Sequence, residues 1–291
     1  MLYKNKKALW LFIVPAIIII LVFLVYPFVR GITYSFFDIK TLGSEDGDFV
    51  GIQNYSDMLN DPTVHTALLN TLLMIGLTLI VQIGLALVLA LMVDSIGRAG
   101  KFFRTVYFFP IVISATAIGL MFNLFYAYNG GMFNQVLQGL GQEPIVWLDE
   151  GRQFFMVAAP VLWQYVGFYF VIILTGLAGV PQDIYESAKI DGTTGLKKVF
   201  KISIPMIWDV LVVCIVLGVT GALKVFDLPW VVAPNGAPAG STHLLGTYLY
   251  FQTFVSGNVG FGSALAVLIV TLGVVISMIL RRVLRREQIV Y

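Results

Sequence analysis

The sequence predicts an all-α integral membrane protein with six transmembrane helices and with both termini in the cytoplasm. Its 291 residues are 58% hydrophobic and only 12% charged, whereas about 25% of the residues of a soluble domain are charged. Six apolar runs have about the length, roughly 20 residues, that crosses a bilayer. Lysine and arginine gather in alternate connections between these runs, as they do at the cytoplasmic ends of membrane helices.

The six apolar runs give the expected spans in chain order. They are residues 10–29, 67–93, 106–126, 154–180, 206–225 and 262–280. The first run follows a lysine-rich start, which a secretory signal peptide also has. It is too long for a signal peptide, and the sequence VYPF at 25–28 is not a small-residue cleavage site. We therefore expect the first run to be an uncleaved membrane anchor.

The positions of the basic residues support this arrangement of spans. Most of the 18 lysines and arginines fall on one side of the alternating arrangement. These are Lys4, Lys6, Lys7, Arg98, Lys101, Arg104, Lys189, Lys197, Lys198, Lys201, Arg281, Arg282, Arg285 and Arg286. The others are Arg30, Lys40, Arg152 and Lys224. A missed span would reverse the alternation after it, and no reversal occurs.

The three connections expected on the outer side have a different character. Residues 38–65 are acidic, and residues 127–153 add further carboxylates. The acidic residues are Asp38, Glu45, Asp46, Asp48, Asp57, Asp61, Glu143, Asp149 and Glu150. Residues 226–261 carry the turn-rich stretch APNGAPAGS and then the aromatic run HLLGTYLYFQTF. These segments suit either simple connectors or a surface that docks a partner, and both interpretations stay open.

The sequence holds no recognisable catalytic or metal-binding constellation. Its single cysteine, Cys214, lies in an apolar run, and its two histidines lie far apart in outer segments. Residues 192–198 contain glycines and lysines without the spacing of a phosphate-binding loop. The net charge of +2 is too small to indicate a nucleic-acid partner. We therefore predict that the chain is not an enzyme and has no catalytic residue, no metal site and no cofactor of its own.

Charged residues are almost absent from the expected spans, which argues against a carrier driven by protons or ions. Lys224 and Asp227 are spaced to pair across one helical turn near the outer end of the fifth span. We expect this pair to be structural, and a proton relay is the alternative. A standalone secondary carrier and an intramembrane hydrolase are the other function classes. They would need coupling charges or a nucleophile–base set inside the membrane.

A polar segment, residues 181–205, separates the fourth and fifth runs on the cytoplasmic side. Pro181 suits a helix start, Asp183 can cap the helix, and Gly192 suits the left-handed residue that ends it. The side chains expected on one face of this helix are Ile184, Tyr185 and Ala188.

A second short helix is expected to begin at Gly195. It would turn Leu196, Val199 and Phe200 toward lipid or protein, and it would turn Lys197, Lys198 and Lys201 toward water. The whole segment fits either a helix–turn–helix that docks in a groove of another protein or an amphipathic connector on anionic headgroups.

The same segment resembles a known motif. The stretch ESAKIDG and, after nine further residues, ISIP match the loop E-A-A-x-x-x-G-(x)9-I-x-L-P of permease subunits of binding-protein-dependent ABC importers. Ser187 stands where alanine is usual, and Ile204 where leucine is usual. The stretches FVGIQNYSDML, FFRTVYFFPIVIS and KVFDLPWVV extend the resemblance over nearly the whole chain, to the first permease of the maltose/glycerol-3-phosphate/multiple-sugar group. A T-x-G-G-P-type turn after the fifth span is replaced by APNGAPAGST.

The resemblance implies the fold of type I ABC importer permeases. Its core of five helices would cover residues 66–285 and include the coupling loop 181–205. A first helix with an acidic outer segment at 1–65 would precede the core, and a tail at 286–291 would follow it. The implied location is the cytoplasmic membrane of a bacterium or archaeon.

The resemblance also implies partners besides membrane lipid. They are a second homologous permease, two copies of a cytoplasmic ATPase, which bind ATP and Mg, and an extracytoplasmic solute-binding protein. The residues expected to couple to the ATPase are Glu186, Ser187, Ala188, Asp191, Gly192, Ile202 and Pro205.

The resemblance implies a sugar or related carbohydrate as the transported solute, with a non-sugar polar solute as the alternative. Sugar-binding sites contain polar groups that hydrogen-bond to the sugar hydroxyls, and they also contain aromatic rings that pack against the sugar. The candidates within or near the spans are Asn123, Tyr126, Gln164, Tyr165 and Tyr169. Each of them also suits interhelical hydrogen bonding or interfacial anchoring.

Overall fold

The computed structural model describes residues 6–41, 43, 47–95 and 100–284, with side chains from Trp10 onward. Several residues used in the charge argument therefore lie outside the described part. They are Lys4, Glu45, Asp46, Arg98, Arg285 and Arg286, together with the tail 286–291 and the side chains of Lys6 and Lys7.

Helices make up most of the described chain. The first half contains α1 (Lys6–Ile20), α2 (Tyr26–Tyr34), α3 (Gln53–Asn60), α4 (Pro62–Leu77), α5 (Ile83–Asp94), α6 (Gly100–Val112), α7 (Ala115–Tyr126) and α8 (Met132–Gly139). The second half contains α9 (Gln153–Ala178), α10 (Gln182–Ile190), α11 (Gly195–Lys198), α12 (Ile204–Met206), α13 (Trp208–Lys224), α14 (Asp227–Val232), α15 (Leu245–Tyr250) and α16 (Val259–Val283).

Shorter elements join these helices. Among the described residues, the π-helical stretches are η2 (Leu21–Val25), η3 (Thr78–Gln82), η5 (Val199–Ser203) and η7 (Phe251–Val255), and a 3₁₀ turn is η6 (Pro234–Gly236). The described strands are β1 (Phe37–Asp38) and β2 (Asp48–Phe49).

Five helical stretches of the described chain are long and apolar enough to cross a membrane, and a bent helix pair would make a sixth. The five are Trp10–Tyr34, Pro62–Asp94, Gln153–Ala178, Trp208–Val232 and Val259–Val283. They confirm the first, second, fourth, fifth and sixth expected spans. Because each span is set by the length of its apolar run, the observed bounds differ from the expected ones by only a few residues at most ends.

The third expected span is not one continuous helix. α6 and α7 meet at 91° across a break of two residues, so the expectation of a single run over 106–126 is wrong. Ser114 has extended backbone with ψ of 141°, and its hydroxyl accepts a hydrogen bond from the Ala117 N–H. This side chain caps the start of α7 and takes the place of the helical hydrogen bond that a continuous helix would make.

Contacts divide the chain into two compact units. One unit holds residues 1–62 and 249–270, and the other holds residues 63–248 and 271–291.

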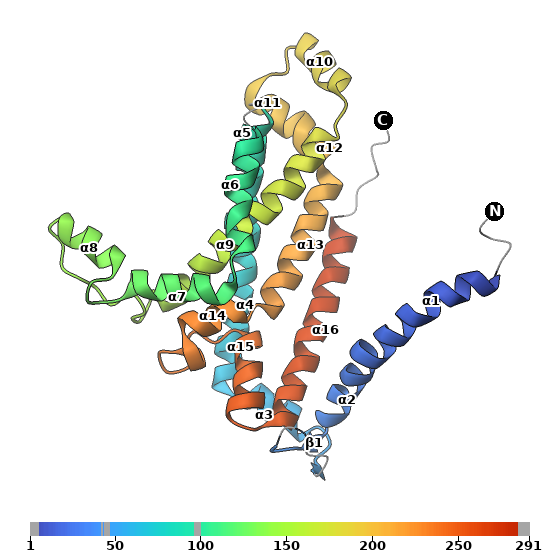
Figure 1. Ribbon diagram of the computed structural model, residues 1–291, viewed down its shortest axis with the longest axis vertical. Coiled ribbons are helices and arrows are strands. Elements are labelled where there is room, and N and C mark those ends of the chain that lie inside the picture. The colour runs from blue at the N-terminus through green and yellow to red at the C-terminus, as the bar shows by residue number, and fades with distance from the viewer. Residues whose placement is uncertain (1–5, 42, 44–46, 96–99, 285–291) are drawn as a thin grey trace. The chain divides into compact units, whose positions relative to one another are not determined.

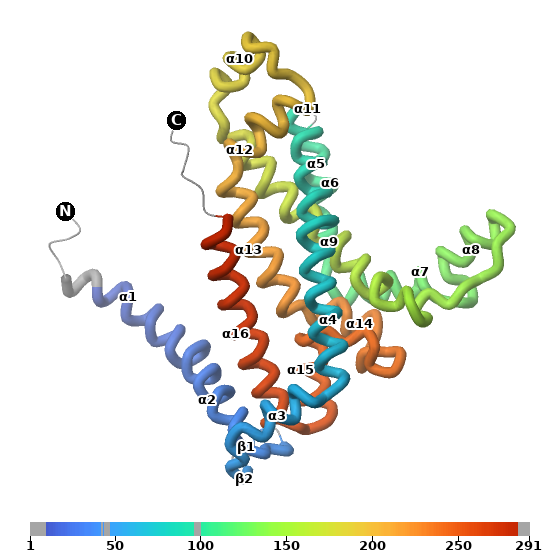
Figure 2. The backbone as a smooth tube through the Cα atoms, turned by 180° about the vertical axis from the view of Figure 1, so that it is seen from behind, coloured from blue at the N-terminus to red at the C-terminus, as the bar shows by residue number. Residues whose placement is uncertain are grey.

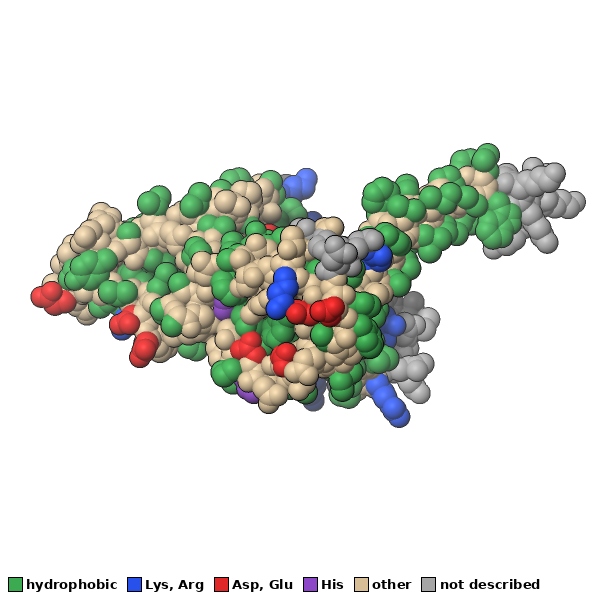
Figure 3. Space-filling view, turned by 90° about the horizontal axis from the view of Figure 1, so that it is seen from below, with side chains coloured by type: hydrophobic (Ala, Val, Ile, Leu, Met, Phe, Trp, Pro, Cys, Tyr) green, Lys and Arg blue, Asp and Glu red, His purple; other side chains and the backbone are tan. Residues whose placement is uncertain are grey.

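In the first unit, the N-terminal helix is covered with apolar side chains (Figure 3). An antiparallel hairpin follows it, in which Phe37 pairs with Phe49 and Asp38 with Asp48. The exposed apolar surface of the helix suits contact with lipid.

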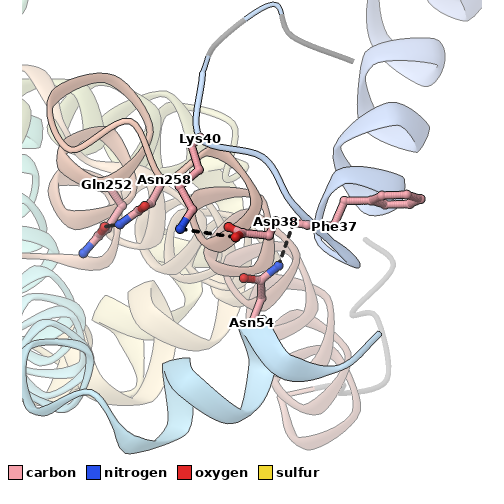
Figure 4. A network of polar contacts seen from close by, with 6 residues as sticks. All are labelled: Phe37, Asp38, Lys40, Asn54, Gln252 and Asn258. Atoms are coloured by element: carbon pink, nitrogen blue, oxygen red, sulfur yellow. Dashed lines mark hydrogen bonds and ion pairs between the residues drawn. The ribbon is translucent and has the colours of Figure 1, made fainter. Parts of the chain in front are cut away.

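The hairpin of the first unit is tied to the start of α16. The Asn54 amide donates to the Phe37 carbonyl at 3.0 Å (Figure 4). The Ile39 carbonyl accepts from the N–H groups of Val259 and Gly260, which are among the free donors at a helix start. A Cβ at Gly260 would overlap the Phe37 carbonyl oxygen, so glycine is required for this close approach.

In the second unit, α9 lies alongside α5 and α6 (Figures 1 and 2). Glycine allows part of this packing, because a Cβ at Gly167 would overlap the Tyr107 carbonyl of α6. One apolar cluster around Phe170, Ile173 and Cys214 fills the space between α5, α9 and α13. A second cluster, which includes Ile118, connects α7, α9 and α14. Small residues and close backbone contact are the usual means by which membrane helices pack.

Candidate functional site

The second unit encloses a cavity of about 520 Å³ among its spanning helices. Its lining comes from α4, η3, α7, α9, α13 and α14. The polar side chains of the lining are Thr78, Gln82, Gln164, Tyr165, Tyr169, Thr220, Lys224 and Asp227. A cavity with apolar walls and a few polar groups has the composition of a small-molecule binding site.

Two glutamines of this lining are buried and oriented by hydrogen bonds to backbone. Gln82 of η3 donates to the carbonyls of Val161 and Leu162 at 3.1 and 3.0 Å. Gln164 of α9 donates to the Ile113 carbonyl at 3.1 Å, at the break between α6 and α7. Both side chains therefore connect helices across the cavity wall.

Aromatic residues supply another part of the lining. Tyr165 and Tyr169 both line the cavity. Tyr165 is 37% exposed, whereas Tyr169 is buried. Gly218 of α13 lies against Tyr169, because a Cβ there would be 3.6 Å from the tyrosine hydroxyl and 3.0 Å from Thr78. The small residue at 218 thus sets how closely α13 approaches η3 and α9.

Lys224 and Asp227 do not form the ion pair expected from their spacing. α13 ends at Lys224, and Val225 is extended with ψ of 129°, so the two residues are not on one helical turn. An ion pair elsewhere in the described part of the chain joins Lys40 to Asp38 at 3.2 Å. Lys224 and Asp227 are both exposed and both line the cavity, so they present separate charges to it.

The structure places three of the five predicted pathway residues at the cavity and two elsewhere. Gln164, Tyr165 and Tyr169 line it. Asn123 donates instead to the Val231 carbonyl at 2.9 Å, and the Tyr126 hydroxyl donates to the Met156 carbonyl at 2.9 Å. The last two side chains connect α7 to neighbouring elements, which matches the alternative of interhelical hydrogen bonding.

Sequence reasoning missed the contributions of Thr78, Gln82 and Thr220. The signal for Gln82 was present, because it and Asn70 are the two side-chain amides inside the apolar run 67–93, and a polar group in a membrane helix usually faces protein or a cavity. The two threonines could not be recognised in this way, because a threonine hydroxyl in a helix commonly donates to a carbonyl of the preceding turn and so needs no cavity. Thr220 does so with the Val216 carbonyl at 2.9 Å.

The predicted coupling segment forms α10 and a second helical stretch, α11 to α12, beyond the ends of α5 and α6 (Figure 1). α10 begins at Gln182 after Pro181, and no side chain caps it. The expectation that Asp183 is the capping residue is therefore wrong. Asp183 lies in the first turn instead, where its negative charge favours the helix start.

Gly192 ends α10 as expected. It has φ of +70°, and the Gly192 N–H donates to the Lys189 carbonyl at 3.1 Å. The Thr193 N–H donates to the Ala188 carbonyl at 2.8 Å. These two bonds form a Schellman motif, in which a left-handed residue satisfies the last carbonyls of a helix.

The two faces of α10 differ in burial. Ala188 is buried and Ile184 and Tyr185 are half-buried, which confirms the expected inner face. Glu186 and Ser187 are exposed, as are Asp191 and Gly192 beyond the helix end. The outer face of α10 is thus polar and accessible.

The second helical stretch differs from expectation at one lysine. Lys197 and Lys201 are exposed, and Leu196 and Phe200 are 76% and 67% exposed. Lys198 is half-buried, with its ammonium 4.1 Å from the centre of the Tyr185 ring. A cation over an aromatic face is attracted to it, so Lys198 ties this stretch to α10 instead of facing water. Ile202, Ile204 and Pro205 are half-buried where the chain enters α13.

The atypical turn at 233–242 is held by α4. The Asn70 amide donates to the carbonyls of Ser241 and His243 at 2.8 and 2.9 Å. His243 is buried against Gly236, where a Cβ would reach its ring, and its Nδ1 lies 3.2 Å from the Thr247 hydroxyl. Burial lowers the pKa of His243 to about 4, because an imidazolium is costly to remove from water.

In the described part of the chain, no group of three or more His, Cys, Asp and Glu residues could hold a metal ion.

Comparison with known proteins gives a consistent result. Residues 82–289 match the family model described as binding-protein-dependent transport system inner membrane component. The probable ABC transporter permease protein YurN of Bacillus subtilis (strain 168) is 32% identical over 279 residues, which cover 94% of both chains. The arabinooligosaccharides transport system permease protein AraP of the same strain is 31% identical over 280 residues, 95% of this chain and 88% of that one.

A solved structure has the same fold. One chain of a bacterial alginate ABC transporter, crystallised with an alginate pentasaccharide-bound periplasmic protein, superposes with a TM-score of 0.86. It is 20% identical, and the match covers 98% of this chain and 96% of that chain. The type I importer permease fold that the resemblance implied is thereby confirmed. The chain belongs to the family of binding-protein-dependent transport system inner membrane components.

Proposed function

We propose that this multi-pass membrane protein is the permease subunit of an ATP-driven importer and translocates a sugar or related carbohydrate. The observation that carries the proposal is the cavity of about 520 Å³ among the spanning helices. Its amides and tyrosines offer hydrogen bonds to hydroxyls, and the rings of Tyr165 and Phe168 offer apolar faces. Relatives named for arabinooligosaccharides and a structural neighbour named for alginate support a carbohydrate.

Energy for transport would enter through the segment 181–205. The exposed side of α10, with Glu186, Ser187, Asp191 and Gly192, would contact a cytoplasmic ATPase. Ala188, on the buried inner face of α10, would support the helix from behind that contact, and Ile202 and Pro205 would pass motion on to α13. An ATPase can drive the cycle only if its ATP-bound form binds one permease conformation more tightly than the other.

The proposed assembly has two permeases in the cytoplasmic membrane of a bacterium or archaeon. Three further subunits would bind to them from the two sides of the membrane. A second, homologous permease would complete the pathway. Two copies of the ATPase would bind ATP and Mg, and this chain would bind neither. An extracytoplasmic solute-binding protein would deliver the solute.

A non-sugar polar solute is the second candidate, and one observation favours it. Lys224 and Asp227 each line the cavity without forming an ion pair with each other. A solute with its own charges could pair with them, whereas a neutral sugar would leave both charges to water or to a partner subunit.

The test has two stages. The chain is purified in mild detergent with its natural partners, and co-purifying subunits are identified by mass spectrometry. The recovered binding protein is then screened by thermal shift against neutral sugars, uronic acids and amino acids. Recovery of an ATPase and a carbohydrate-stabilised binding protein is the expected result. Uptake by the chain reconstituted alone, without an ATPase, would contradict the proposal and favour a secondary carrier.

A further inference from the structure

We infer that Gln164 is the positioning residue that holds the bend between α6 and α7. The inference concerns only the bend and needs no solute, so it does not depend on the proposed function.

The bend leaves the Ile113 carbonyl, among others at the end of α6, without its helical partner. In a continuous helix the Ile113 carbonyl would accept from the Ala117 N–H. The Ser114 hydroxyl takes that N–H instead, at 3.2 Å. The Gln164 amide supplies the missing donor to Ile113 at 3.1 Å. Such a replacement is needed because irregular backbone at membrane depth is stable only when its polar groups find partners.

This hydrogen bond fixes which way the amide faces. The Ile113 carbonyl can accept a hydrogen bond and cannot donate one, so the amide nitrogen of Gln164 must face it. The Oε1 atom then points away, and it has no hydrogen-bond partner among the described residues. Gln164 is 4% exposed, so this acceptor is buried, and an unpaired buried carbonyl lowers stability.

Two other glutamines show that the arrangement is particular to Gln164. Gln82 also lines the cavity, but its donor is used by carbonyls within α9, so it does not reach the bend. Gln153 is half-buried and has a buried Oε1 with no partner among the described residues, but its amide nitrogen lies 3.5 Å from the Ser241 hydroxyl and not at the bend. Gln153→Met is therefore the matched control for the loss of an amide whose oxygen is unpaired.

The bend is tested with spin labels in the full chain in lipid nanodiscs. Labels replace Phe102 and Leu124, which are 68% and 71% exposed, in a background with Cys214→Ala. A rise of 1.5 Å per residue and an angle of 91° give a backbone separation of about 22 Å for the bent form and about 33 Å for a straight helix. Double electron–electron resonance separates these distances.

Gln164→Met is expected to move part of the population toward the longer distance, and Gln153→Met is expected to leave the wild-type distribution unchanged. Ser114→Ala frees the Ala117 N–H to pair with Ile113 and is expected to shift the distance in the same direction. Should Gln164→Met fail to give a monodisperse protein, Gln164→Leu, which also lacks a donor, takes its place. A distribution for the Gln164 variant equal to that of Gln153→Met overturns the inference.

Discussion

The segment 181–205 is stabilised by hydrogen bonds between neighbouring residues. The helix body around the cavity, formed by α4, η3, α7, α9, α13 and α14, is stabilised by hydrogen bonds between distant ones. The bonds that end α10 join residues only three and five positions apart, at Lys189–Gly192 and Ala188–Thr193. In the helix body, Gln164 and Gln82 bond to carbonyls 51 and 79 positions away. The conformation of a short exposed segment can therefore be determined by its own residues, whereas the cavity forms only when distant helices pack together. Four substitutions or conditions separate these two cases, and they are given in order of decreasing effect.

Gly167→Ala in the helix body is expected to have the largest effect. A Cβ at this position would overlap the Tyr107 carbonyl, so α9 must move away from α6. We expect a loss of about 3 kcal/mol or more in the free energy of unfolding, as for other overpacked or strained cores. Thermal unfolding in detergent measures it. Gly84→Ala is the control, because a Cβ at Gly84 meets nothing within 4 Å. Equal melting temperatures for the two variants would show that this helix contact is not tight.

Acid is expected to lower the free energy of unfolding through His243, which is buried beside the turn at 233–242. Burial lowers the pKa of His243 to about 4 in the folded protein, against about 6.5 when unfolded. The unfolded chain therefore binds a proton that the folded chain rejects, and stability falls as the pH drops from about 6.5 to about 4, by up to about 3 kcal/mol.

The measurement for His243 is denaturant unfolding between pH 7.5 and pH 4. His243→Gln is expected to reduce the slope of stability against pH over this range. Carboxylates also titrate in this range, so the difference between variants decides the result. The prediction is wrong if wild type and His243→Gln lose stability in parallel.

Gly192→Val is expected to have an intermediate, local effect in the coupling segment. The position has φ of +70° and open space around it, so the cost is conformational, about 1–2 kcal/mol for a residue other than glycine. We expect the end of α10 to fray and less ATPase to co-purify, while membrane insertion and the melting temperature stay close to wild type. Gly192→Asn, which tolerates this backbone conformation, is the control. Retention of the ATPase by the valine variant would argue against docking at α10.

Glu186→Lys is expected to have the smallest effect on stability. Glu186 is exposed, and surface substitutions usually change stability by less than about 0.5 kcal/mol. If α10 docks to the ATPase, the charge reversal should still reduce co-purification, with no change in unfolding. Glu143→Lys, at an exposed position of the 127–153 segment, is the matched control. An equal amount of ATPase with both variants would count against the coupling role of Glu186.

Much of the fold could be predicted from sequence because its causes lie within short stretches. Five spans follow from apolar length alone, and the end of α10 follows from Gly192, since a left-handed residue is needed there and glycine adopts that conformation without strain. The start of α10 was predicted less well. Asp183 was expected as the cap, but Pro181 fixes the backbone two residues earlier.

The candidate site could be predicted only in part. Gln164, Tyr165 and Tyr169 were found as polar or aromatic residues in an apolar run. The same criterion also selected Asn123 and Tyr126, whose polar groups bond to nearby backbone. No local pattern distinguishes the two groups, because the choice between a cavity and a helix contact depends on which elements surround the side chain.

By itself, the sequence determined that this protein crosses the membrane repeatedly and carries a polar helix with a defined end between its fourth and fifth apolar runs. Hydrophobic length and helix termination depend on a few neighbouring residues, so they can be read locally. Only the tertiary structure decided the bend after α6, the separation of Lys224 from Asp227 and the position of the cavity. These features arise where hydrogen bonds between distant segments replace helical ones, as the Gln164 amide does for Ile113, and where packed helices leave space between them.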